Sequence, residues 1–131
     1  MYIDFSKYQS PIKELVFDSD DLENDFYRKI IMILSNGTKI KIEAIGDCCS
    51  SSIFEKYENY DFKILIGKII TGIKEISLPD DYVYPEEPSY NDCISPHLYE
   101  IRFKDSDESL KFLLVNYSNG YYDGWINTEI I

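Results

Sequence analysis

The chain has 131 residues, and 13 basic against 24 acidic side chains give it a formal net charge of −11. This length and apolar content predict one folded domain, residues 1–131, that buries about two-thirds of its unfolded surface. So acidic a chain repels phosphate backbones, which argues against direct nucleic-acid binding. An acidic surface instead suits a basic protein partner, or simply keeps the protein in solution.

The first half of the chain predicts a strand, a connector and a hairpin. Residues 12–17 form the strand, and the acidic residues 18–25 form a connector or a short helix. Asn36-Gly37 favours a type I′ turn, which would place Ile33 opposite Ile40. Since side chains alternate along strands, one face of this hairpin is then buried in the core and the other faces solvent. The predicted core face consists of Ile31, Ile33, Ile40, Ile42 and Ala44.

The middle of the chain predicts the helical part. Residues 50–60 read as a short helix, because Glu55 follows Ser52 at the spacing of a capping box. Residues 61–66 add one helical turn that Gly67 ends. A strand over 68–78 follows, and the proline-rich stretch 79–96 is predicted to be a long irregular loop.

The last third predicts a second hairpin and an edge strand. Apolar and charged residues alternate over 99–104, the polar residues 105–108 form a loop, and 110–117 is apolar on both faces. That return strand is therefore expected to be central. Residues 124–131 add an edge strand. Together these elements predict an α+β fold: a mainly antiparallel β-sheet of about six strands, with a barrel-like form as an option, and one or two short helices.

Three cysteines and one histidine are the candidates for site chemistry. Cys48, Cys49, Cys93 and His97 match the number of ligands that zinc needs, and Asp47 could substitute. Adjacent strand residues point to opposite faces, however, so structural thiols are favoured over a metal. A reactive thiol at Cys49 stays open, because it would precede a helix start. Asp47 is better explained as a helix-entry acceptor, and His97 as a surface residue in a loop.

Aromatic residues gather in two stretches and predict a recognition surface. Tyrosine and tryptophan with Ser, Asn and Gly are typical of protein-binding surfaces, although the same rings can plug the ends of a β-rich core. Carboxylates near the first stretch would form a rim that steers a basic partner: Asp80, Asp81, Glu86 and Glu87. The predicted partner-binding residues are Tyr82, Tyr84, Glu86, Glu87, Tyr90, Asn119, Tyr121, Tyr122 and Trp125.

The order of three motifs resembles an uncharacterised family of small phage and bacterial proteins. The motifs are Asn36-Gly37, Asp47-Cys48-Cys49 and the late segment 118–122, Ser-Asn-Gly-Tyr-Tyr. Serines follow Cys49 where that family would have a glutamate. The resemblance implies an accessory protein of a phage or mobile element and transfers no activity.

These observations favour a non-enzymatic binding protein over an enzyme. No nucleophile–base pair, phosphate-binding loop or metalloprotease motif can be read from the chain. We expect an acidic inhibitor that occludes a protein partner, of the toxin-immunity or phage anti-defence type, without cofactor or metal. The alternative is a protein that sequesters a small nucleotide signal, for which Arg28, Arg102 and Lys104 are the sparse cationic candidates. The odd number of cysteines, the lack of a signal-like start and the lack of a bilayer-length apolar run favour the cytoplasm and no membrane contact.

Overall fold

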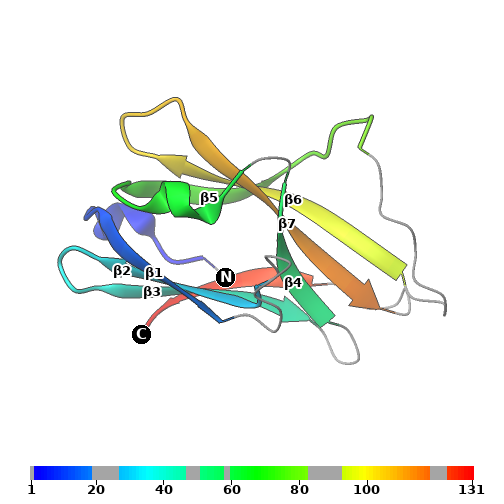
Figure 1. Cartoon of the computed structure of the whole chain (residues 1–131), viewed down its shortest axis with the longest axis horizontal. Coiled ribbons are helices and arrows are strands. Elements are labelled where there is room, and N and C mark those ends of the chain that lie inside the picture. Colours follow the sequence, from blue (N-terminus) through cyan, green and yellow to red (C-terminus); the bar gives the residue numbers. More distant parts are fainter. Residues whose placement is uncertain (1, 19–26, 47–50, 58–59, 83–92, 119–123) are drawn as a thin grey trace.

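The computed structural model describes residues 2–18, 27–46, 51–57, 60–82, 93–118 and 124–131 (Figure 1). These residues form eight strands and two short 3-10 helices. The strands are β1 (Ile12–Asp18), β2 (Lys29–Leu34), β3 (Lys39–Gly46), β4 (Ser51–Lys56), β5 (Ile70–Ile76), β6 (Cys93–Phe103), β7 (Ser109–Ser118) and β8 (Gly124–Ile130). The 3-10 helices are η1 (Phe5–Lys7) and η2 (Phe62–Leu65).

The strands build two open antiparallel sheets that face each other as a sandwich (Figure 1). One sheet has the order β1-β2-β3-β8 and the other β4-β7-β6-β5. The expected α+β fold with a barrel-like option is therefore wrong. The described residues contain no α-helix, and neither sheet closes on itself.

The largest local correction concerns the helix predicted over residues 50–60, where the structure has strand β4. Phe54 pairs with Leu114 of β7, and its backbone also exchanges two hydrogen bonds with Tyr27. Ser52 and Phe54 are buried, whereas Ile53 and Glu55 are only partly covered, which is the alternation of a strand. The capping-box spacing favours a helix only locally, and pairing of this segment with the long apolar strand β7 overrides that preference.

The hairpin of β2 and β3 exists, but its register differs from the predicted one by one residue. Met32, rather than Ile33, pairs with Ile40. The turn is longer than a two-residue type I′ turn: Leu34 N donates to Thr38 O at 2.8 Å, and among the turn residues Gly37 alone has a positive φ, 90°. A slip of one residue exchanges the two faces of a strand. The buried face therefore carries Ile30, Met32, Leu34, Ile40 and Ile42, and the predicted inward positions Ile31 and Ile33 face outward.

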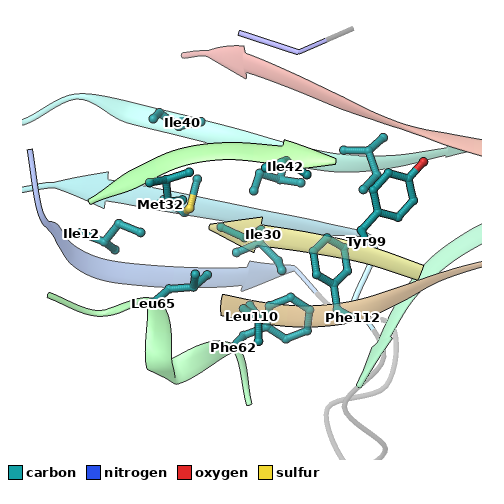
Figure 2. Packing of buried hydrophobic residues seen from close by; sticks show 14 of the residues in the cluster. Ile12, Ile30, Met32, Ile40, Ile42, Phe62, Leu65, Tyr99, Leu110 and Phe112 are labelled. Atoms are coloured by element: carbon teal, nitrogen blue, oxygen red, sulfur yellow. The ribbon is translucent and has the colours of Figure 1, made fainter. Parts of the chain in front are cut away.

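The main core lies between the two sheets (Figure 2). β1, β2 and β3 supply its aliphatic side, while Tyr99 of β6 and Phe112 of β7 stack with ring centroids 5.9 Å apart. Phe62 and Leu65 of η2 and Phe5 of η1 complete it.

Three predicted elements form where the sequence indicates. Residues 12–17 form a strand, residues 61–66 contain one helical turn followed by Gly67 at φ 86°, and residues 124–131 contain an edge strand.

A second buried cluster covers the outer face of the β4-β7-β6-β5 sheet. It comprises Tyr57, Leu98, Leu113 and Val115, and half-buried Tyr82 packs against it. β7 is consequently central and buried on both faces, as predicted.

The irregular loop predicted over 79–96 is too long at its C-terminal end, because strand β6 already begins at Cys93. The pairing of β5 with β6 ends at Leu98, so at Pro96 strand β6 pairs with β7 alone. A proline is tolerated at such a position because it lacks only a backbone donor that a second neighbour would need.

Candidate functional site

The strand registers bring the flanks of all the predicted site segments to one end of the sandwich. Gly46 of β3 pairs with Gly124 of β8, and Ser118 of β7 pairs with Cys93 of β6. Tyr117 of β7 pairs with the first residue of β4. These described strand ends therefore lie together, at the right of Figure 1. We call this region the loop end.

Close packing joins the two sheets at the loop end. Asn116 Nδ2 donates a 2.8 Å hydrogen bond to Ser52 Oγ, and both residues are buried. Gly124 lies directly against this pair. A Cβ built on Gly124 would overlap Ser52 Oγ and come within 2.8 Å of Ile45 O. Only glycine fits between the strands at this position.

The structure places two of the predicted partner-binding residues. Trp125 is 44% exposed on β8, next to buried Ile126, so it lies on the outer face of the β1-β2-β3-β8 sheet beside its cross-strand partner Ile45. Tyr82 lies on the outer face of the other sheet, half-buried. The two rings therefore do not share one surface. Outside the described residues lie Cys48, Cys49, Tyr84, Glu86, Glu87, Tyr90, Asn119, Tyr121 and Tyr122.

The described part of the predicted acidic rim is a turn. Asp80 and Asp81 are exposed, and Tyr82 N donates to Pro79 O at 3.0 Å to close the turn. Because Tyr82 packs against the second buried cluster, its ring anchors this turn to the sheet. The position of the two carboxylates is therefore fixed by the packing of Tyr82.

His97 does not lie in a loop, as predicted, but in β6, and it has a carboxylate neighbour. Its Nδ1 is 3.2 Å from Glu75 Oε2, and Tyr99 Oη donates to Glu75 Oε1 at 3.5 Å. Burial raises the pKa of Tyr99, and its hydrogen bond with Tyr2 and the charge of Glu75 raise it further. Burial likewise raises the pKa of Tyr2. This chain of groups links the N-terminal segment to β5 and β6.

The sequence analysis missed a buried carboxylate on the outer face of the same sheet. Glu100, 7% exposed, accepts hydrogen bonds from Arg102 Nη1 at 3.2 Å and from Ser109 Oγ at 3.1 Å. Burial alone would raise the pKa of Glu100, but these two bonds and the charges of Arg102 and Lys74 lower it. The sequence pattern that bears on Glu100 is the alternation over residues 99–104. It places Glu100 and Arg102 on one face of the strand but does not indicate that this face is partly buried.

Neither a membrane span nor a metal centre emerges from the described residues. None of their helices is long and apolar enough to cross a membrane. Nowhere in the described ranges do three or more His, Cys, Asp or Glu side chains come together in a way that could hold a metal ion. The cysteine segment 47–50 lies outside those ranges, so the predictions for Cys48 and Cys49 stay predictions.

Comparison with known proteins identifies one viral relative. The chain is 34% identical over 110 residues to "Uncharacterized protein L278" of Acanthamoeba polyphaga mimivirus, a match that covers 81% of each chain. The chain belongs to the same family as this mimivirus protein. No family model and no solved structure matches the chain.

Proposed function

We propose that this protein is a non-enzymatic, acidic binding protein that inhibits a basic protein partner by occluding it, through the loop end and Trp125. The observation that carries the proposal is the exposed Trp125 beside Ile45 at the loop end of the sandwich. Tryptophan is enriched among residues that dominate protein-binding energy. Loops gathered at one end of a β-sandwich form the binding surface of variable immunoglobulin domains.

Among the described residues, the face that carries Trp125 has a second exposed apolar side chain, Val16. Its other apolar residues, Val16, Ile31, Ile33 and Ile45, belong to neither buried cluster, and Val16 is 43% exposed. Exposed apolar residues on a sheet face supply contact area, and a net charge of −11 attracts a basic partner before contact. These two properties give the complex its affinity and its association rate respectively.

The proposal favours a virus-encoded or mobile-element inhibitor that acts in the cytoplasm. The mimivirus origin of the relative supports a viral setting. An occluding inhibitor needs a rigid scaffold and a complementary surface rather than catalytic groups, and the sheets packed at Gly124 provide such a scaffold.

Affinity capture with a matched pair of variants tests the proposal. Immobilised wild-type protein, Trp125→Ala and Ile66→Ala are each incubated with an extract of the cells in which the protein is naturally made. Ile66 is a suitable control because it is 50% exposed and follows η2, away from the loop end. We expect a basic protein retained by the wild type and by Ile66→Ala but lost with Trp125→Ala. Equal retention by all three baits would contradict the proposal.

A further inference from the structure

A cluster of cations lies on the outer face of the β4-β7-β6-β5 sheet, away from Trp125. The registers place Lys74 of β5 and Lys111 of β7 on either side of Glu100 of β6. The neighbouring row consists of Gly72, Arg102 and Ser109. Residues directly opposite each other on one face of a sheet have Cβ atoms about 5 Å apart. Three cations thus lie around one carboxylate on this face.

Glu100 holds the cluster in place. Its carboxylate is nearly buried, and it fixes the Arg102 guanidinium through a hydrogen bond from Nη1. A guanidinium has five N–H donors in a planar fork, and this bond uses one of them. The Arg102 side chain is still 48% exposed. The remaining donors of this guanidinium can contact an anion, because the planar fork matches the geometry of carboxylate and phosphate groups.

The surface beside Arg102 is hollow. Gly72 has no side chain, and a cavity of about 270 Å³ lies there, lined by Thr71, Gly72, Ile73, Lys74 and Arg102. On the other side of Ser109 lies a second hollow, lined by Tyr60, Ile64, Asp107, Glu108, Ser109 and Lys111. In it, Lys111 Nζ lies 6.0 Å from the centre of the Tyr60 ring. The cations therefore border concave surface, with an aromatic ring nearby.

We propose that Lys74, Arg102 and Lys111 form a binding site for the phosphate group of a small phosphate-bearing molecule. The arginine fork matches the geometry of a phosphate, and the two lysines on the same face add positive charge. The acidic residues elsewhere exclude nucleic acid, whose many phosphates extend far beyond the patch. Asp107 and Glu108 line the second hollow and not the one beside Arg102. More distant carboxylates matter less to a small anion, because charges more than about 10 Å away are largely screened at ordinary ionic strength.

Titration with inorganic phosphate and with AMP, followed by amide NMR at constant ionic strength, tests this site. We expect saturable shifts confined to residues 71–74 and 100–111, with a dissociation constant of roughly millimolar or below. Saturable binding of inorganic phosphate would show that the free anion is sufficient for binding at this site. Tighter binding of AMP than of phosphate would show that the nucleoside also contacts the protein. Saturation by neither probe would overturn the proposal.

Charge-matched variants make the result specific. Lys74→Gln with Lys111→Gln leaves the Glu100–Arg102 pair intact and should weaken binding about tenfold or more. Lys39→Gln removes one exposed cation from β3 of the opposite sheet and should leave the affinity unchanged. Equal affinities in the wild type and the double variant would overturn the assignment. Because the Trp125 face is on the other sheet, this outcome does not depend on the proposed inhibition.

Discussion

Gly124 of β8 lies so close to Ser52 of β4 that a Cβ at position 124 would overlap the serine hydroxyl. This contact joins the two sheets at the loop end. Gly124→Ala should therefore lower the free energy of unfolding by about 1–3 kcal/mol, since overpacking forces strands apart. Chemical denaturation measures the effect. Gly72→Ala is the matched control, because nothing lies within 4 Å of a Cβ at Gly72. Equal stabilities of the two variants would disprove the close packing.

Phe54 should behave as a core residue of a strand. It is fully buried, and its ring meets that of Phe112 edge-on at 5.5 Å. Phe54→Ala should cost about 3–5 kcal/mol in the free energy of unfolding, from lost burial and the cavity left behind. Trp125→Ala, at an exposed site, should change it by about 0.5 kcal/mol or less. Urea denaturation of both variants decides. A Phe54→Ala protein as stable as the wild type would be incompatible with this position for β4.

Glu100 should contribute to the loss of stability in acid. Its folded pKa is lowered from the ordinary value of 4.5, because hydrogen bonds and nearby cations outweigh its burial. The charged form therefore stabilises the fold above pH 4.5, and this contribution disappears as the pH falls through the lower folded pKa. Glu100→Gln should be less stable than the wild type at pH 7, with the difference shrinking in acid.

The measurement for Glu100 is the midpoint of urea denaturation across the acid range. Asp4→Asn is an informative second variant, because hydrogen bonds from Ser6 lower the pKa of Asp4 at the surface. It should change the same profile much less than Glu100→Gln does, since exposed groups contribute little. Parallel profiles for the wild type and Glu100→Gln would count against the buried hydrogen-bonded carboxylate.

Strand patterns with clear alternation or continuous apolar character were predictable from the sequence. The strands around 12–17 and 110–117 form where expected, and β7 is central because both its faces are apolar. The hairpin at Asn36-Gly37 was predicted in kind but not in register. Loop length decides register, and Gly37 alone supplies the positive φ of a longer turn. One residue of difference reverses the faces of β2.

The strand structure within residues 50–60 could not be predicted from local sequence patterns. Ser52 and Glu55 have the spacing of a capping box, yet Ser52 instead accepts a hydrogen bond from Asn116, 64 residues later. Long-range pairing of this kind leaves no periodic trace in the sequence. The same holds for the candidate site: sequence proximity suggested aromatic stretches, whereas the strand registers show which of their flanks meet at the loop end.

The association rate constant of the captured partner, measured against ionic strength, tests the central claim most directly. Steering by the acidic surface predicts that this rate constant falls by about tenfold or more between low and high salt. Trp125→Ala should keep the same salt dependence while the complex dissociates faster. An association rate that does not respond to salt, together with an unchanged dissociation rate for Trp125→Ala, would contradict the account.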